Sequence, residues 1–177
     1  MDARPVLERI AGLAPRRGFT LVGVGGRGGS GKSTLARSLP GAQVVGTDEF
    51  WDGAAFDLGR LRAEVFVPLL AGAAPRYQSY DWEARRRRPT ARVVDPSGLI
   101  VIEGVCALHR LFRDDYDLRV WVEAAREIRL ERGIARDGEA ARATWVEVWM
   151  PMEDRYVERD DPVSAADVIV DGSGDPP

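Results

Sequence analysis

The sequence predicts an α/β fold in which a parallel sheet lies between two layers of helices. Short apolar runs alternate with segments of helical periodicity along most of the chain, which is typical of strands joined by crossover helices. The first apolar run leads directly into a glycine-rich loop and then into a helical segment. At 177 residues and 45% hydrophobic content, the chain is long enough for one well-buried core. We therefore expect a single domain over residues 1–177.

The expected strands are short apolar runs that end at glycine or at charged residues. They cover residues 19–24, 44–47, 99–102, 118–122 and 168–170. Each run is of ordinary strand length and is separated from the next by turn or helix signals. These runs predict a sheet of five strands.

The expected helices show apolar residues at helical spacing. They cover residues 3–13, 57–70, 126–136 and 139–159, and a further helix opens at about residue 33. Asp57 is a typical N-cap, and Gly72 is a typical stop signal. Pro68 should bend the last turn of its helix, and Pro151 should kink or divide the last helical segment. In that segment, a stripe of apolar residues favours packing against the core. The stripe consists of Trp145, Trp149, Met152 and Tyr156.

Composition argues against several classes of partner. The net charge of -3 and pI of about 5.3 do not favour a general nucleic-acid binder, although residues 85–88 form a local arginine run. A single cysteine, Cys106, excludes an internal disulfide framework. We find no apolar window long enough to cross a bilayer and no signal-peptide pattern at the N-terminus. We therefore expect no nucleic-acid partner, no membrane partner and a cytoplasmic location.

Residues 26–33 match the phosphate-binding loop pattern G-x-x-x-x-G-K-[ST] in full. Lys32 is the only lysine among the 25 Lys and Arg residues. A compact ammonium group with three donors suits the β- and γ-phosphates, whereas a planar guanidinium prefers paired, side-on contacts. Glycines let the backbone curl so that successive N–H groups point at the anion. The residues expected to bind ATP are Gly26, Gly28, Gly29, Ser30, Gly31, Lys32, Ser33 and Thr34.

Two carboxylates follow expected strands directly. Asp48 comes after the second strand, and Glu103 ends the third. In parallel sheets the ligand crevice lies beyond the carboxyl ends of the strands, so both side chains should lie near the loop. With the hydroxyl of Ser33 they suggest a Mg2+ site, and Asp48 could also accept the proton of a substrate hydroxyl. The alternatives are a turn aspartate at position 48 and a capping or salt-bridged glutamate at position 103.

Taken together, these motifs resemble the uridine kinase-like family of P-loop kinases over about residues 19–172. The segments that carry the resemblance are the glycine-rich loop, TDEFW at 47–51, YDW at 80–82, VIEG at 101–104, RLERGIARD at 129–137 and ADVIV at 166–170. Each segment is short, but all six occur in the order found in that family and with compatible spacing, although the loop near Asp52 is shorter by about one residue.

The resemblance implies a P-loop NTPase sandwich with a five-stranded parallel sheet of order 2-3-1-4-5. It implies transfer of the γ-phosphoryl group of ATP to a hydroxyl group of a nucleoside or similar small molecule, with Mg2+. Lys32 and Asp48 then correspond to catalytic residues, with Asp48 as the base, and Ser33, Asp48 and Glu103 to the metal site. Arg132 and Arg136 resemble arginines of a lid at about residues 126–142. They are four residues apart, so they share a helix face. The alternative is that they are solvated and paired with Glu127 or Glu131.

The acceptor site is expected within residues 50–90. Tyr80 and Trp82 resemble the aromatic residues that line the nucleoside pocket of the family, and Asp52 falls near its ribose-binding aspartate. Arg85 stands where pyrimidine kinases of the family carry a histidine, and the lid lacks the family's Arg-Gly-Arg stretch. An arginine there suits an anionic or carbonyl-rich acceptor, unless residues 85–88 form a solvated loop. The acceptor could therefore be a vitamin, a sugar or a pantothenate-like molecule.

Two other classes of function remain as alternatives. A GTPase-like switch would need an [NT]-K-x-D segment, which a chain with one lysine cannot provide after using it in the loop. A catalytically inactive or regulatory nucleotide-binding protein would keep the loop without transferring phosphate. The sequence leaves the oligomeric state open.

Overall fold

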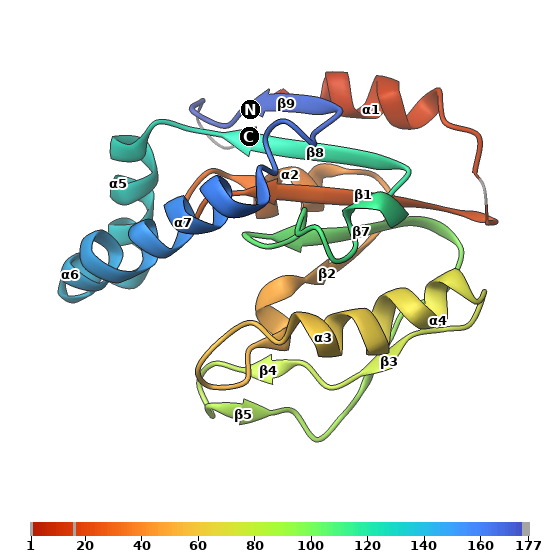
Figure 1. Ribbon diagram of the computed structural model, residues 1–177, viewed down its shortest axis with the longest axis horizontal. Helices are drawn as coiled ribbons and strands as arrows, with labels where there is room; N and C mark the ends of the chain where they lie inside the picture. Colours follow the sequence, from red (N-terminus) through yellow and green to blue (C-terminus); the bar gives the residue numbers. More distant parts are fainter. Residues whose placement is uncertain (1, 16, 175–177) are drawn as a thin grey trace.

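A five-stranded parallel sheet forms the centre of the computed structural model, which describes residues 2–15 and 17–174 (Figure 1). Its strands are β1 (Phe19–Gly26), β2 (Ala42–Gly46), β7 (Gly98–Gly104), β8 (Leu118–Glu123) and β9 (Val168–Asp171). They lie in the order β2-β7-β1-β8-β9. Counted along the chain, this order is 2-3-1-4-5, so the predicted order is confirmed. The domain expected over 1–177 includes positions 1, 16 and 175–177, which lie outside the described residues.

Helical segments connect the strands and cover both faces of the sheet (Figure 1). The α-helices are α1 (Arg4–Ala11), α2 (Lys32–Ser38), α3 (Leu58–Leu61), α4 (Val67–Leu70), α5 (Arg126–Asp137), α6 (Arg142–Thr144) and α7 (Met150–Asp160). The 3-10 turns are Thr47–Phe50, Arg113–Asp115 and Glu139–Ala141, and the π-helical turns are Arg62–Phe66 and Trp145–Trp149. The first π-helical turn joins α3 to α4 in one continuous helix, and the side chain of Asp57 caps it by accepting the N–H of Arg60 at 2.9 Å.

The expected helix over residues 139–159 is irregular before its proline. A 3-10 turn, α6 and a π-helical turn precede α7, which begins at Met150. Pro151 lies at the start of α7, which directly follows the π-helical turn, and a proline at this point cannot donate a main-chain hydrogen bond to the preceding turn. The expected packing stripe holds only in part, because Trp145 and Tyr156 are buried while Trp149 and Met152 are 39% and 44% exposed.

Four short strands form two small antiparallel sheets below α3 and α4 in Figure 1. In the first, β3 (Arg76–Tyr77) pairs with β6 (Arg92–Val93), and in the second, β4 (Tyr80–Asp81) pairs with β5 (Arg86–Arg87). Strand β4 lies against the 3-10 turn that follows β2. This packing brings the expected acceptor region next to the carboxyl end of the central sheet.

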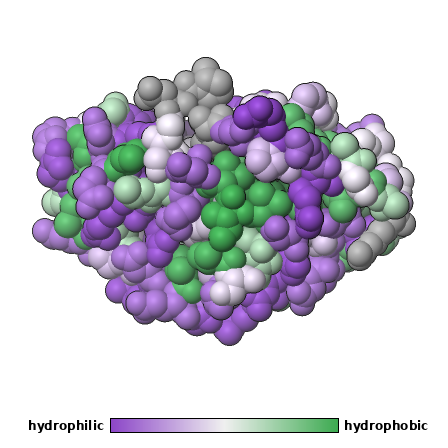
Figure 2. Space-filling view, turned by 90° about the horizontal axis from the view of Figure 1, so that it is seen from above, coloured by the Kyte–Doolittle hydropathy of each residue, from purple (hydrophilic) through white to green (hydrophobic). Residues whose placement is uncertain are grey.

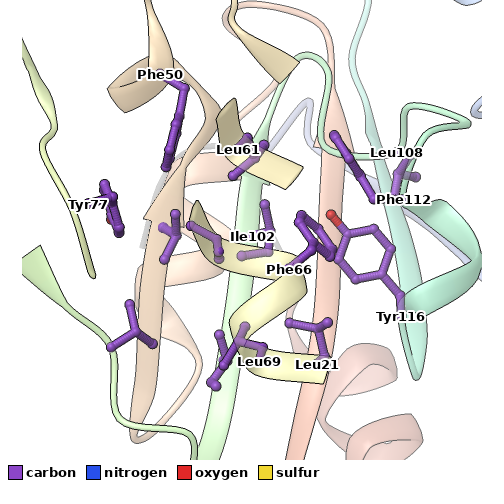
Figure 3. Packing of buried hydrophobic residues seen from close by; sticks show 14 of the residues in the cluster. Leu21, Phe50, Leu61, Phe66, Leu69, Tyr77, Ile102, Leu108, Phe112 and Tyr116 are labelled. Atoms are coloured by element: carbon purple, nitrogen blue, oxygen red, sulfur yellow. The ribbon is translucent and has the colours of Figure 1, made fainter. Parts of the chain in front are cut away.

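Alternating side chains on the central strands build a core on each face of the sheet. Leu21 and Ile102 face the helix formed by α3 and α4, and Figure 3 shows Leu61 and Phe66 packed over them. The neighbouring residues Val22 and Val101 belong to the opposite core with α1 and α2. Burial on both faces fixes the register of the sheet, and with it the position of each strand end.

Figure 2 shows apolar side chains gathered in the middle of the face that carries α1 and β9. Ile169 of the edge strand β9 is 58% exposed. Within residues 2–15 and 17–174, no helix has the length and apolar character needed to cross a bilayer.

Candidate active site

Residues 26–33 form a tight loop between β1 and α2. Gly29 and Gly31 have φ angles of 76° and 96°, in the left-handed region that favours glycine. Lys32 is the first residue of α2, and its Nζ lies 3.5 Å from the carbonyl oxygen of Arg27. Ser30 is fully buried, and its Oγ has no hydrogen-bond partner among the described residues. The loop therefore curls back on itself and holds a buried hydroxyl group that is free to donate or accept.

Ser33 and Glu103 meet directly. The hydroxyl Oγ of Ser33 lies 3.1 Å from each carboxylate oxygen of Glu103. The register of the sheet explains the contact, because β1 and β7 are parallel neighbours and Glu103 pairs with Val24 just before the loop. Burial raises the pKa of Glu103 above its ordinary value, and the ammonium group of Lys32 opposes this rise.

Asp48 lies in the 3-10 turn directly after β2. Its position follows from the sheet, because Gly46 at the end of β2 pairs with Glu103 of β7. Burial raises the pKa of Asp48, the carboxylate of Glu49 adds to the rise, and the ammonium group of Lys32 opposes it. Lys32 thus acts electrostatically on both Asp48 and Glu103.

The two arginines of the expected lid lie in α5 but make different contacts. Arg132 donates hydrogen bonds to the carbonyl oxygens of Gly29 at 3.3 Å and of Gly172 at 2.7 Å, and to those of residues 173 and 174. Arg136 pairs with Asp137 at 2.7 Å and lies over the ring of Trp145. Among the described contacts, neither arginine pairs with Glu127 or Glu131. Arg132 therefore ties α5 to the loop and to the C-terminal segment.

An aromatic cluster stands in the expected acceptor region. The ring of Trp82 stacks on that of Trp51 at 5.5 Å and meets Tyr80 edge-on at 5.1 Å. Trp82 is 53% exposed, so one face of the cluster is open to solvent. Asp52 is engaged in its own turn, where Oδ1 accepts the N–H groups of residues 54 and 55 at 2.8 Å. Trp51 was not among the acceptor-site residues predicted from the sequence, although an aromatic residue directly before Asp52 could have indicated it.

In the arginine run at 85–88, Arg85 ends the turn of the β4–β5 hairpin, Arg86 and Arg87 form β5, and Arg88 follows that strand. Arg85 is exposed and has a φ angle of 52°, which is uncommon for a residue with a side chain. Arg88 pairs with Asp81 at 3.2 Å. A cavity of about 390 Å³ opens nearby, and its lining includes none of the site residues predicted from the sequence. The lining residues are Arg60, Glu64, Arg76, Tyr77, Gln78, Arg87, Pro89 and Ala91.

Sequence reasoning also missed a buried carboxylate beside the loop. Glu153 of α7 accepts the N–H of Gly28 at 2.8 Å and pairs with Arg129 of α5 at 3.3 Å. Its spacing from Trp149 and Tyr156 placed it on the expected packing face, and no local motif marks it as polar and buried. Only the fold brings it to the loop.

Side chains at the loop offer oxygen atoms of the kind that could hold Mg2+ together with substrate phosphates. Among the described residues, no group of three His, Cys, Asp or Glu side chains is arranged to hold a metal. Mg2+ commonly uses only one or two carboxylates and completes its shell with water and substrate phosphates. Ser33, Glu103 and the nearby Asp48 provide oxygen ligands of that kind, and the unpartnered hydroxyl of Ser30 adds a polar atom to the loop.

Comparison with known proteins identifies relatives of this chain. A family profile described as the phosphoribulokinase / uridine kinase family matches residues 41–173. A uridine kinase of Halobacterium salinarum is 26% identical in an alignment that covers 77% of this chain and 74% of the relative. A uridine kinase of Brevibacillus brevis is 27% identical in an alignment that covers 87% of this chain and 85% of the relative. The family match begins after residue 33. The phosphate-binding loop at residues 26–33 is therefore evidence independent of that match.

The fold has a counterpart among solved structures. A possible uridine kinase from Bacillus stearothermophilus superposes with a TM-score of 0.74 and 21% sequence identity, over 96% of this chain and 97% of that chain. At this identity the likeness concerns the fold. It agrees with the parallel sheet and its strand order.

Proposed function

We propose that this chain, which belongs to the phosphoribulokinase / uridine kinase family, transfers the γ-phosphoryl group of ATP to a hydroxyl group of a small molecule. One observation carries the proposal. Lys32, Ser33, Asp48 and Glu103 come from three segments of the chain, and they converge at the carboxyl end of the sheet. A phosphate-binding loop with two carboxylates beside it is the arrangement that phosphoryl transfer needs.

Each of these residues has a role in this proposal. The loop N–H groups and the ammonium group of Lys32 bind the β- and γ-phosphates. Ser33 and Glu103 would hold Mg2+, with Asp48 as a direct or water-mediated ligand, and the metal neutralises charge on the phosphates when bound. Asp48 also accepts the proton of the acceptor hydroxyl.

The lid arginines supply positive charge from α5. Arg132 is already held at the loop by its bond to the carbonyl of Gly29. Arg136 is 68% exposed at its side chain and is paired with Asp137, so it can turn toward the phosphates when the lid closes. Such charges favour the transition state because negative charge spreads over the transferred group.

The acceptor that we propose is a nucleoside. Two uridine kinases are among the relatives, and the cluster of Trp51, Tyr80 and Trp82 offers an exposed ring on which a base can stack. Asp52 and Arg85 lie at the edges of this region. The exposed arginines of the hairpin favour a second candidate, a non-nucleoside acceptor that carries a carboxylate or phosphate group.

A transfer assay tests the proposal. The purified protein is incubated with Mg-ATP and one acceptor at a time from a panel of nucleosides, sugars and pantothenate-like alcohols. ADP release and the mass of the product are both measured. We expect at least one acceptor to gain a phosphoryl group, with a nucleoside as the best substrate. Binding of ATP without transfer to any acceptor would favour the inactive or regulatory alternative.

A further inference from the structure

Glu153 takes no part in the proposed chemistry, yet its carboxylate joins three segments of the chain. One oxygen accepts the N–H of Gly28 in the loop at 2.8 Å, and the other pairs with Arg129 of α5 at 3.3 Å. The side chain of Glu153 is 9% exposed and that of Arg129 is 5% exposed. Arg129 also donates to the carbonyl of Ala124 at 3.2 Å. The carboxylate is therefore held in one position from both sides.

The loop packs closely against these segments. A Cβ atom added at Gly28 would lie 2.7 Å from Oε1 of Glu153 and 2.9 Å from the ring of Trp145. A Cβ atom added at Gly29 would lie 2.4 Å from the carbonyl oxygen of Arg129. The first half of the loop thus has no room to move toward α5 and α7.

Next to Glu153, a second contact also joins α7 to the phosphate-binding loop. Arg27, the residue before Gly28, pairs with Asp154 at 3.1 Å and with Glu123 at 3.4 Å. Two successive residues of α7 therefore bind two successive residues of the loop. Such a pair of contacts fixes both the position and the direction of this part of the main chain.

Two effects of the carboxylate on nucleotide affinity oppose each other. Its negative charge lies near Lys32 and by itself repels a polyphosphate. Its hydrogen bond holds the loop in a curled conformation, which spares a ligand the entropy loss of ordering it. The sign of the change in affinity upon removing the carboxylate shows which effect is larger.

We propose that Glu153 is a positioning residue that holds the phosphate-binding loop in its binding conformation and ties it to the lid helix α5. The inference rests on the nucleotide-binding part of the proposed function and on no particular acceptor. The hydrogen bond to Gly28 outweighs the repulsion, so removal of the carboxylate weakens nucleotide binding although it removes a negative charge.

Calorimetric titration with Mg2+ and a non-hydrolysable ATP analogue tests this inference. We expect Glu153→Ala to raise the dissociation constant of the analogue at least tenfold, which is about 1.4 kcal/mol. Glu153→Gln keeps an oxygen that can accept the N–H of Gly28, so it should stay within about threefold of the wild type. Unchanged or tighter binding in folded Glu153→Ala protein would overturn the proposal.

The controls separate positioning from folding and from the function itself. Glu158→Ala removes an exposed carboxylate from the same helix and should bind the analogue like the wild type. If Glu153→Ala does not fold, the double variant Glu153→Ala with Arg129→Met leaves no unpaired buried charge and carries the same expectation. A wild-type protein that does not bind the analogue would contradict the proposed function. Wild-type binding with no loss in the Glu153→Ala or double variant would contradict only this inference.

Discussion

The hydroxyl group of Ser33 lies 3.1 Å from both carboxylate oxygens of Glu103, although the two residues are 70 positions apart in the sequence. Ser33 belongs to the first turn of α2, and Glu103 lies near the end of β7. The parallel pairing of β1 with β7 brings them together. The contact shows how the sheet order sets the spacing of the proposed metal ligands.

Replacement of Lys32 should abolish nucleotide binding. We expect both Lys32→Ala and Lys32→Arg to lose measurable affinity for the ATP analogue or all phosphoryl transfer, since a guanidinium does not reproduce a compact ammonium in the curled loop. Calorimetry and the transfer assay measure the two effects. Arg37→Ala, an exposed change on the same helix, is the control and should behave like the wild type. Wild-type turnover by Lys32→Ala would contradict the kinase proposal.

Replacement of Asp48 should separate binding from transfer. In Asp48→Asn the amide cannot accept the proton of the acceptor hydroxyl, so we expect transfer to fall by about 10²-fold or more. Binding of the ATP analogue should remain close to that of the wild type. Asp57→Asn serves as the control because asparagine is as good an N-cap as aspartate. A wild-type rate of transfer in Asp48→Asn would show that Asp48 has only a structural role in its turn.

The stability of the protein should depend on the charge of Glu153. Burial raises the pKa of Glu153 above its ordinary value of 4.5. A carboxyl group with a raised pKa in the folded state stabilises the fold below its unfolded pKa, and that contribution is lost as the pH rises through the folded pKa. Glutamine does not titrate. We therefore expect the free energy of unfolding of Glu153→Gln, relative to the wild type, to increase as the pH rises from about 4.

Urea denaturation of both proteins across this pH range measures the difference. Glu158→Gln controls for the loss of a carboxylate from the exposed side of α7. A difference between Glu153→Gln and the wild type that shrinks with rising pH would show that the ion pair with Arg129 outweighs the burial of the charge.

The two lid arginines should differ in their effect on stability. Arg132 donates to main-chain carbonyls of the loop and of the C-terminal segment, so Arg132→Ala should lower the free energy of unfolding by about 1.5–3 kcal/mol. The exposed pair of Arg136 with Asp137 should contribute about 1 kcal/mol or less. Chemical denaturation of the two variants provides the comparison. Equal losses would contradict the anchoring role of Arg132.

A side chain at position 172 should displace the main chain of the phosphate-binding loop. A Cβ atom at Gly172 would lie 2.0 Å from the carbonyl oxygen of Ser30, so Gly172→Ala must push the loop main chain. We expect the dissociation constant of the ATP analogue to rise at least tenfold, or about 1.4 kcal/mol. In Gly12→Ala the nearest atom would be 3.6 Å away, so this variant is the matched control. Equal affinities of the two variants for the ATP analogue would show that displacement of the loop does not weaken nucleotide binding.

The strands and the loop could be predicted because their signals are local, whereas the order of the strands was implied by the family resemblance. Apolar runs marked the strands, and the spacing of Gly26, Gly31 and Lys32 marked the loop. The rule that ligands lie beyond the carboxyl ends of strands placed Asp48 and Glu103 at the same edge. Their closeness to Lys32 agrees with that expectation.

The contacts of α5 and α7 could not be predicted because they depend on how distant segments pack. Glu153 lies 125 residues from Gly28 in the sequence, and its helical spacing resembled that of a packing residue. Pro151 was expected to kink or divide the last helix, and the irregularity takes the form of a π-helical turn at Trp145–Trp149, a form that the proline alone does not specify. Arg132 shares a helix face with Arg136, yet its partners are carbonyls that no sequence pattern identifies.

The ammonium group of Lys32, only partly buried at the start of α2, is the sole side-chain primary amine in the polypeptide. Acylating reagents that attack amines would therefore modify one side chain, and it is the one that we propose to bind the nucleotide phosphates. Protection of that single position by added ATP would report occupancy without any knowledge of the acceptor.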